Sequence, residues 1–450
     1  MEIKKVDVFF LVIFSFVCGL VSHCQQLAFP SAQGFGAYSQ GGRGGDVYIV
    51  KNLNDLGEGS LRHGIKSAQG PRTIIFAISG IIELKTPLLV NKNYLTIAGQ
   101  SAPGDGICLK DAGLIIDANH VIIRFIRSRL GDNSGRKDDA ISIVGGSNVI
   151  IDHCSASWSV DEVLSVSTSK KDDIDNITIQ WCIISEALNN SIHDKKEHGY
   201  GALIRGCYGA KYSYHHNLFA HNASRNPRPG NYDINSHEVD TLGLLLDFKN
   251  NVIYNWKGSR PGYDADKKSK CNYNYVGNYV KPGPDSYKKS VAYDAKSPFF
   301  NAFYSDNFFF GKIPEDQWSF VRFKGLTERE KESYISLTEF ESNVKTENPL
   351  TAYKNVLRLA GASLNRDDVD SRVVSDVING TGKIIDDEVQ VGGWPIYKTT
   401  ITDSDVDKDG IPDSWELKHG LNPQDPLDGN MLCDGYTYLE KYLNEKANNY

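Results

Sequence analysis

A repeat of short strand-like segments sets the strongest limit on how this chain can fold. Residues 94–98, 121–125, 149–154 and 177–182 recur at a spacing of roughly 26 to 28 residues, each with an Asn one or two positions ahead. Two more segments begin at Tyr212 and Leu245, after insertions. The intervals hold no long amphipathic helix, which a doubly wound sheet or a (β/α)8 barrel would need. The repeat therefore predicts an all-β fold of stacked coils, a parallel β-helix.

Alternation within these strands points every second side chain into the coils. At the repeat spacing, Cys154 lies over Cys182 and His153 lies over Trp181 on adjacent coils. The cysteines of the chain are scattered, without the spacing of a disulfide framework. We therefore expect Cys154 and Cys182 to be buried apolar residues in an interior stack rather than a disulfide.

Changes in composition divide the chain into four parts. The strand repeat fades at 276–280, and Pro-Gly-Pro at 282–284 breaks it. Residues 285–345 are irregular and rich in Tyr and Phe, and apolar spacing then predicts helices over 350–362 and 366–377. The predicted parts are a signal peptide (1–24), a β-helix (25–284), an irregular and helical extension packed on it (285–401) and a small separate module (402–450).

The first residues have the pattern of an export signal. Lys4 and Lys5 precede an apolar run over 8–21, and small or polar residues follow it. The run is too short to favour a membrane-spanning helix. His23 stands where a lipoprotein cleavage site has a small residue, which argues against anchoring at Cys24. We expect a protein that is secreted or held at the cell envelope, with no transmembrane segment in the mature chain.

The charge balance argues against nucleic acid as a partner, because the formal net charge is -7. An anionic substrate would need a local group of cations or a bound cation in so acidic a protein. The segment 212–230 offers such cations. It begins as a strand and ends in a Pro-broken loop that carries Arg225 and Arg228, whose guanidinium groups stay charged at neutral pH.

Four carboxylates precede this loop on consecutive coils. Asp138 and Asp139 lead into one coil, and Asp161 and Glu162 lie just after the next strand. Stacking of the coils brings these side chains close to one another and to Arg225. They form either a salt-bridge network or a metal and substrate site.

An insertion between coils carries Lys195, Lys196 and His198. A solvated charged loop is the ordinary interpretation of such a run. The alternative is contact with an anionic substrate, because the insertion lies close in sequence to the arginine loop.

The last segment matches the twelve-residue calcium loop. Side-chain oxygens stand at loop positions 1, 3, 5, 9 and 12, and Gly410 stands at the turn position 6. A solvated acidic run is the alternative, and Asp425, Asp428 and Asp434 leave room for a second site. We expect Ca²⁺ to stabilise the fold of this segment, which is too small to fold alone. The predicted ligands are Asp405, Asp407, Asp409, Asp413, Glu416 and the main-chain carbonyl of Ile411.

Six segments together resemble the pectate lyases of polysaccharide lyase family 1. They are Ala-Phe-Pro-Ser-Ala-Gln-Gly-Phe-Gly-Ala from 28, Gly-Gly-Arg-Gly-Gly from 41, Gly-Ser-Leu-Arg from 59, Thr-Ile-Ala-Gly-Gln-Ser-Ala-Pro-Gly from 96, Ile-Asp-His-Cys-Ser-Ala-Ser-Trp-Ser-Val-Asp-Glu from 151, and His-His-Asn-Leu-Phe through Arg-Asn-Pro-Arg over 215–228. The resemblance implies a right-handed parallel β-helix that cleaves polygalacturonate by β-elimination with Ca²⁺. It implies pectate or pectin, an anionic plant cell-wall polysaccharide, as the partner.

The resemblance also implies roles for the two arginines. The C5 proton of a uronate lies beside a carboxylate, so its removal builds negative charge that cations stabilise. In this family the Arg of an Arg-x-Pro motif takes that proton, and the matching residue here is Arg225. Arg228 matches a position that holds substrate carboxylates.

The implied calcium shell departs from the family pattern at one position. Asp139 and Asp161 match the first two aspartates, but Ser165 stands where a further acid is usual. Either Glu162 or the substrate then completes the shell. The family's substrate lysine corresponds to Lys195 or Lys196, and we assign both of these, with His198, to substrate binding.

Other activities stay open beside a pectate lyase. Ser165 leaves room for a lyase that prefers methyl-esterified pectin. A β-helix hydrolase of the polygalacturonase type would use Asp138, Asp139 and Asp161 as acid and base. The third alternative is a non-catalytic carbohydrate-binding protein. In each case we expect a monomer.

Overall fold

The structure, a computed structural model, describes residues 25–448 apart from 168–173, 231–239, 266–268 and 401–402. The predicted signal peptide, with Cys24, lies outside these described residues. None of the helices in the described part has the length and apolar composition needed to cross a membrane.

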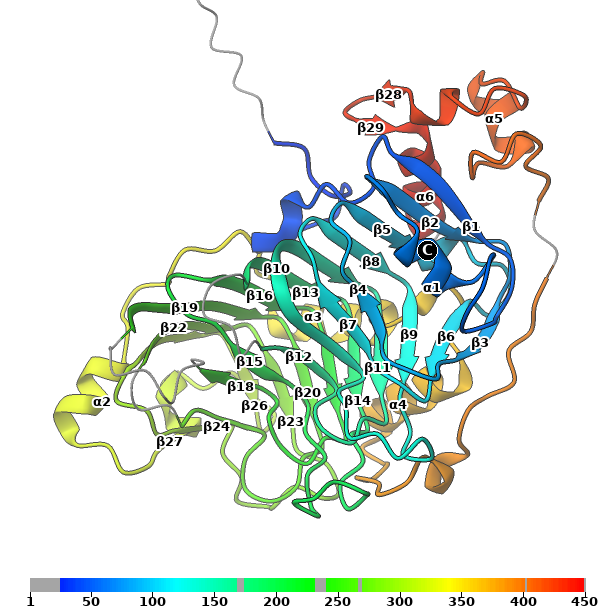
Figure 1. Cartoon of the computed structure of the whole chain (residues 1–450). Coiled ribbons are helices and arrows are strands. Elements are labelled where there is room, and N and C mark those ends of the chain that lie inside the picture. Colours follow the sequence, from blue (N-terminus) through cyan, green and yellow to red (C-terminus); the bar gives the residue numbers. More distant parts are fainter. Residues whose placement is uncertain (1–24, 168–173, 231–239, 266–268, 401–402, 449–450) are drawn as a thin grey trace, which may run out of the picture.

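Parallel sheets form the body of the molecule (Figure 1). The first sheet contains, in order, β1 (Asp46–Val50), β2 (Arg72–Phe76), β5 (Leu95–Ala98), β8 (Val121–Arg124), β10 (Ile141–Asp152), β13 (Ile174–Gln180), β16 (Lys211–His215), β19 (Asp240–Lys249), β22 (Ser269–Val276) and β25 (Phe300–Ser305). The second contains β3 (Gly80–Glu83), β6 (Ile107–Lys110), β9 (Ile126–Arg129), β11 (Ser155–Ser157), β14 (Ile183–Ser185), β17 (Leu218–Ala220), β20 (Val252–Tyr254), β23 (Tyr279–Lys281) and β26 (Phe308–Phe309).

A third face joins the first sheet through the long strand β10. Its strands are β4 (Leu88–Val90), β7 (Leu114–Asp117), the start of β10, β12 (Leu164–Val166), β15 (Leu203–Arg205) and β18 (Arg228–Gly230). A short sheet of β21 (Gly262–Tyr263), β24 (Tyr293–Ala295) and β27 (Val321–Phe323) is also parallel. The chain visits the sheets in turn, so each circuit makes one coil.

The register of the strands explains the sequence repeat. Val149 pairs with Val121 on one side and with Ile177 on the other. Ile177 in turn pairs with Tyr212, at a longer interval because the chain inserts a loop between β14 and β15. The prediction of a parallel β-helix is confirmed.

Aromatic rings stack where the chain turns from the first sheet to the second. Phe125, His153, Trp181 and His216 each have a φ between 49° and 55°, which is uncommon outside glycine. The ring centroids lie 4.8, 6.0 and 4.4 Å apart along this column. Contact between rings on successive coils stabilises the conformation. The predicted placement of His153 over Trp181 is confirmed.

The predicted cysteine stack is also confirmed. Cys154 and Cys182 are fully buried and are not linked by a disulfide. Both thiols lie in the main hydrophobic core with Ile151 and Ile179. Burial of such small apolar groups, rather than a covalent link, stabilises the stack.

The coils continue past the predicted end. β25 pairs with β22, β26 with β23 and β27 with β24. The prediction that the β-helix ends at 284 and that 285–345 is irregular was therefore wrong. Pro-Gly-Pro at 282–284 lies in the connection between β23 and β24, where no ladder hydrogen bond is lost. The aromatic residues of this region, which suggested an outer covering, include core side chains such as Tyr293 and Tyr304.

Helices of the extension cover the second sheet. The helices predicted over 350–362 and 366–377 correspond to α3 (Pro349–Leu359) and α4 (Asp368–Asn379). Val356 and Val373 share a buried cluster with Leu218 and Val252. Shorter helical elements are η1 (Phe35–Tyr38), α1 (Leu61–Lys66), η2 (Gly99–Ser101), η3 (Gln317–Phe320), α2 (Glu328–Tyr334), η4 (Ser363–Asn365) and η5 (Glu388–Val391).

The C-terminal segment folds against the first coils (red in Figure 1). Its elements are α5 (Asp413–His419), η6 (Asp428–Asn430), β28 (Leu432–Cys433), β29 (Tyr436–Thr437) and α6 (Tyr438–Asn448). Ile411 and Leu439 share a buried cluster with Ile75 and Ala98 of the β-helix. We call residues 403–448 the tail. It is a small unit attached to the coil stack by an apolar contact.

Candidate active site

The residues predicted to carry chemistry lie at the starts of neighbouring strands on the third face. Asp139 precedes β10, Glu162 precedes β12 and Arg225 precedes β18. Tyr200 precedes β15 and bridges Glu162 on one side and Ser224 on the other. Because parallel strands begin at the same edge, the fold gathers side chains that are far apart in the sequence.

Three carboxylates meet at this edge. Asp139, Asp161 and Glu162 each offer an oxygen within 4.8 Å of the other two. Asp139 accepts hydrogen bonds from the Glu162 main-chain N–H at 3.0 Å and from Ser142 Oγ at 2.9 Å. Burial, and after it the negative charge of Asp161, raises the pKa of Asp139 to about 8. An oxygen-only cluster of this charge fits a hard divalent cation such as Ca²⁺.

Ser165 occupies the place where the family pattern has an acid. It is buried, its Oγ accepts a hydrogen bond from the Leu203 main-chain N–H at 3.2 Å, and its hydroxyl also bonds Asp139. Glu162 is the additional carboxylate that stands beside the two aspartates. The cluster therefore has three acids even though residue 165 is a serine.

Arg225 contacts this cluster directly. Its Nη1 pairs with Glu162 Oε1, and its guanidinium lies over the Tyr200 ring, 4.4 Å from the centroid. Burial lowers the pKa of Arg225 from its ordinary value. The backbone at Arg225 has a φ of 58°, a conformation that such a residue seldom adopts. The cation is held between an aromatic face and a carboxylate, in a strained backbone.

His198 belongs to the cluster and not to a solvated loop. Its side chain is buried, and its Nε2 lies 2.5 Å from Asp161 Oδ1. Burial raises the pKa of Asp161, but the bond and the charge of His198 outweigh it, and the pKa is lowered. The His198 ring lies against His193 and Tyr200, with both centroid distances 4.0 Å. His193, His198, Tyr200 and Arg225 thus form a column behind the carboxylates.

The two lysines of the same insertion lie at the surface. Lys195 and Lys196 are both exposed, and the Lys195 main-chain N–H donates to His193 Nδ1 at 3.1 Å. The structure brings their loop to the cluster through His198.

Sequence reasoning missed further cations beside Arg228. Tyr263 of β21 has the guanidinium carbon of Arg228 at 6.0 Å, that of Arg260 at 4.6 Å and Lys296 Nζ at 4.8 Å from its ring centroid. Burial raises the pKa of Tyr263, but the charge and hydrogen bond of Arg225, with the charges of Arg228 and Arg260, outweigh it, so the pKa is lowered. Four cations around one phenol form a positive surface next to the acidic cluster. Arg260 stands directly before Pro-Gly, as Arg228 does, and that likeness was the available signal.

The tail holds a second acidic group. Oxygens of Asp405, Asp407 and Asp409 lie within 4.8 Å of one another, and so do oxygens of Asp409, Glu416 and Asp428. Both Glu416 carboxylate oxygens and one oxygen on each of Asp407, Asp409 and Asp428 are buried without a hydrogen-bond partner in the described part of the chain. Such buried oxygens are costly unless a cation binds them, so these residues fit Ca²⁺.

Two details of the tail loop differ from its sequence pattern. Asp413, at loop position 9, accepts a hydrogen bond from the Val406 main-chain N–H at 2.9 Å and is absent from the gathered oxygens of the described residues. Asp428, which the sequence suggested for a separate site, joins Asp409 and Glu416 instead. Its side chain also accepts from the Asn422 main-chain N–H at 2.7 Å. The segment after α5 folds back and brings Asp428 to the calcium loop.

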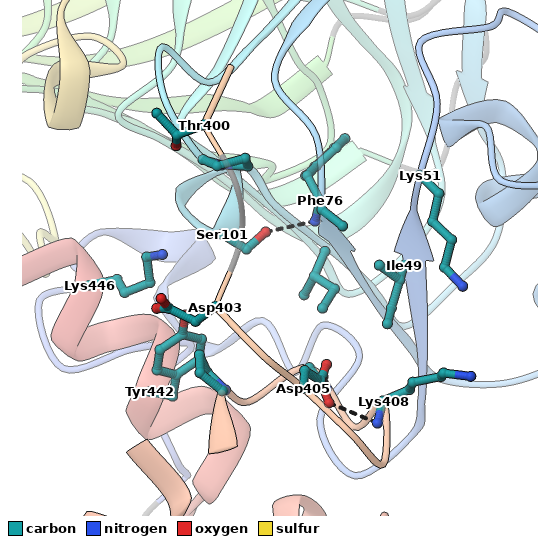
Figure 2. A pocket seen from close by; sticks show the side chains of 15 residues that line it. Ile49, Lys51, Phe76, Ser101, Thr400, Asp403, Asp405, Lys408, Tyr442 and Lys446 are labelled. Carbon is teal, nitrogen blue, oxygen red and sulfur yellow. Dashed lines mark hydrogen bonds between the residues drawn. The ribbon is translucent and has the colours of Figure 1, made fainter. Parts of the chain in front are cut away.

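A pocket of about 540 Å³ lies between the tail and the first coils (Figure 2). Figure 2 shows Ile49 and Phe76 of the β-helix facing Asp405, Tyr442 and Lys446 of the tail. None of the residues that line it belongs to the acidic cluster or to the arginine loop. The pocket is a gap left by the attachment of the tail and is not part of the candidate active site.

The fold and site define a β-helix protein that presents acids and guanidinium groups at one strand edge. Comparison with known proteins identifies its relatives. Probable pectate lyase C of Aspergillus flavus is 34% identical over 430 residues, 93% of this chain and 93% of that protein. Probable pectate lyase C of Aspergillus terreus is 35% identical over 428 residues, again 93% of each. No protein-family model matches the chain.

Among solved structures, jun a 1, the major allergen from cedar pollen, has a TM-score of 0.49 and 21% identity, covering 73% of this chain and 92% of that one. Pectate lyase Bsp165PelA from Bacillus sp. N165, in complex with trigalacturonate, has a TM-score of 0.46 and 16% identity, covering 73% and 98%. On its full-length sequence relatives, this chain belongs to the pectate lyase family, polysaccharide lyase family 1.

Proposed function

We propose that this protein is a calcium-dependent pectate lyase that cleaves (1→4)-α-D-galacturonan by β-elimination and leaves unsaturated oligogalacturonates. One observation carries the proposal. A guanidinium with a lowered pKa, Arg225, lies against three gathered carboxylates and beside further cations. The family of the chain and this geometry support the same chemistry.

In this mechanism Arg225 removes the C5 proton of the uronate. A guanidinium in water seldom acts as a base, because its pKa is above about 12 and it therefore almost always keeps its proton. Here burial lowers that pKa, and the nearby Arg228 lowers it further. Tyr200 beneath the guanidinium holds it in one orientation toward the substrate. Deprotonation becomes easier as pH rises, so we expect an alkaline optimum.

The other cations hold the charge of the substrate. Arg228 would offer two parallel N–H groups to a uronate carboxylate, and Arg260 and Lys296 also lie around the Tyr263 ring. We assign Lys195 and Lys196 to the same task from the exposed loop. His198 is reassigned. It is buried against Asp161 and orients that carboxylate rather than touching the polysaccharide.

Asp139, Asp161 and Glu162 would hold Ca²⁺ at this site. When bound, the ion supplies positive charge that stabilises the carboxyl group of the uronate while negative charge develops on it. The high pKa of Asp139 means that its proton must leave before a cation binds. Glu162, which pairs with Arg225 in this structure, would be a ligand shared between the guanidinium and the ion.

The tail calcium loop has a structural role in this proposal. Asp405, Asp407, Asp409, Glu416 and Asp428 would bind one Ca²⁺, with the main-chain carbonyl of Ile411 at loop position 7. Asp413 would contribute through a water or not at all, since its carboxylate already bonds a main-chain N–H. We further propose that residues 1–24 direct export, so that the enzyme meets its polysaccharide outside the cytoplasm.

A product assay tests the function. Purified protein is mixed with polygalacturonate and Ca²⁺ at alkaline pH, and the absorbance of the 4,5-unsaturated product is followed beside the release of reducing ends. We expect both signals to rise together. Reducing ends without unsaturation would establish a hydrolase, and binding without either signal would establish a carbohydrate-binding protein. Methyl-esterified pectin in a parallel reaction distinguishes a pectin lyase.

A further inference from the structure

A third group of carboxylates shares no residue with either site described above. Asp132, Asp387 and Glu388 each offer an oxygen within 4.8 Å of the other two. Asp132 lies in the loop that follows β9, and the other two residues lie at the start of η5 in the extension. We propose that these residues form a further Ca²⁺ site, which fastens the extension to the loops of the active site.

The buried Glu388 side chain directs an unpartnered oxygen into this group. It is 0% exposed, and its Oε1 accepts a hydrogen bond from Asn133 Nδ2 at 2.9 Å. Its Oε2 is buried and has no hydrogen-bond partner in the described part of the chain. Burial raises the pKa of this carboxyl group, and with the charges of Asp132 and Asp387 it outweighs main-chain hydrogen bonds from Glu388 and Asp132 that lower the pKa. A buried carboxylate oxygen that lacks a partner and faces two acids is costly unless a cation binds there.

The donor set selects the class of ion. All three side chains offer carboxylate oxygens, and Ser191 Oγ, which donates to Asp132 Oδ2 at 2.8 Å, adds another oxygen nearby. No described Lys, Arg or His forms an ion pair with any of the three acids. Oxygen ligands with several negative charges favour a hard cation, and a site assembled from separate loops suits the flexible coordination of Ca²⁺ better than that of Mg²⁺.

The position of Asp132, Asp387 and Glu388 suggests what a bound ion would do. Asp132 lies on the loop that leads to Asp139, and Ser191 lies on the insertion that leads to His198. Next to the site, Asp386 accepts a hydrogen bond from the Asn190 main-chain N–H at 2.8 Å. One ion here would therefore hold three segments together, two of which carry residues of the candidate active site. The binding itself does not depend on the proposed lyase activity.

A nearby tryptophan provides a direct readout. The ring of Trp394 packs on Gly131, the residue before Asp132, so an ideal Cβ at Gly131 would lie 2.4 Å from it. Tb³⁺ that replaces Ca²⁺ at this site should emit when Trp394 is excited. The full chain is titrated with Tb³⁺, and bound Ca²⁺ is counted by equilibrium dialysis, for the unchanged protein and for Glu388→Gln, Asp132→Asn and Trp394→Phe.

We expect Glu388→Gln and Asp132→Asn each to lose one bound Ca²⁺ per chain and part of the sensitised emission. Trp394→Phe should lose that emission but keep the number of bound ions. Glu315→Gln, which changes an exposed acid elsewhere, is the matched control and should change neither. Asp132 is only partly buried, so its variant tests the site even if Glu388→Gln fails to fold. Full Ca²⁺ stoichiometry in folded Asp132→Asn would overturn the proposal.

Discussion

The acids of the active-site face and those of the tail are similar in number but face different partners. On the active-site face, His198 lies against Asp161 and Arg225 pairs with Glu162. In the tail, Asp409 and Glu416 face other acids, and their pKa values rise to about 7, chiefly through burial. No described Lys, Arg or His forms an ion pair with either of them.

This difference distinguishes a candidate catalytic site from a site that stabilises the fold. Carboxylates paired with cations keep their geometry before an ion or a substrate arrives, and the same cations can then act on the substrate. Unpaired buried carboxylates repel one another, so they need an ion to fold. We therefore expect the first group to govern the rate of the reaction and the second to govern stability.

The largest expected effect is the loss of Arg225. Arg225→Ala should lower kcat by about 10² to 10⁴-fold, because it removes the group that takes the proton. In saturating Ca²⁺ its melting temperature should stay close to that of the unchanged protein, because the ion then replaces Arg225 as the partner of Glu162. Arg358→Ala, at an exposed position on α3, is the control and should keep full activity. Steady-state kinetics on polygalacturonate would contradict the assignment if Arg225→Ala kept more than a tenth of the rate.

Calcium removal should destabilise the tail in a pH-dependent way. Without Ca²⁺, Asp409 and Glu416 keep their protons in the folded chain up to about pH 7, whereas in the unfolded chain they lose them near their ordinary pKa. The stability of the calcium-free protein therefore falls as pH rises through this window. Ca²⁺ at 100 times its dissociation constant adds about 2.7 kcal/mol. Thermal melts should show a larger increase with Ca²⁺ at pH 8 than at pH 5, and an equal increase at both would argue against this assignment.

The calcium requirement of catalysis should depend on pH through Asp139. Below its pKa of about 8 a proton competes with the cation, so the Ca²⁺ concentration for half-maximal rate should rise roughly tenfold for each unit of decreasing pH. Above pH 8 it should level off. Rates measured over a Ca²⁺ series at several pH values check this, and a requirement independent of pH from 6 to 9 would exclude Asp139 as a ligand.

The smallest expected effect concerns the aromatic support of Arg225. Tyr200→Leu removes a cation–π contact worth about 0.5–1 kcal/mol, which corresponds to a loss in kcat of roughly twofold to fivefold. Tyr200→Phe keeps the ring and should keep the rate. The pH profile of kcat separates a positioning role of Tyr200 from a merely structural one. Tyr200→Leu should shift the alkaline side of this profile, and Tyr200→Phe should not.

The strand repeat predicted the fold because a short pattern returns along the chain. The Pro-broken loop drew attention to Arg225, which the structure places against Glu162. His198 was assigned to substrate binding from its sequence position alone, since nothing in the run Lys-Lys-Glu-His shows that the chain turns its ring inward against Asp161. Arg260 was missed because it approaches Tyr263 only after the coils have stacked. The end of the β-helix was misplaced because a Pro-rich connection resembles a terminus when the strands beyond it are short.

One pair of variants tests the separation of the two acidic groups most directly. kcat at saturating Ca²⁺ and melting temperatures with and without Ca²⁺ are measured for Asp161→Asn and Glu416→Gln in the full chain. We predict that Asp161→Asn lowers kcat at least about tenfold and keeps most of the stabilisation by Ca²⁺, while Glu416→Gln keeps its rate and loses most of that stabilisation. A Glu416→Gln variant that loses its rate while folded, or an Asp161→Asn variant that keeps it, would contradict the account.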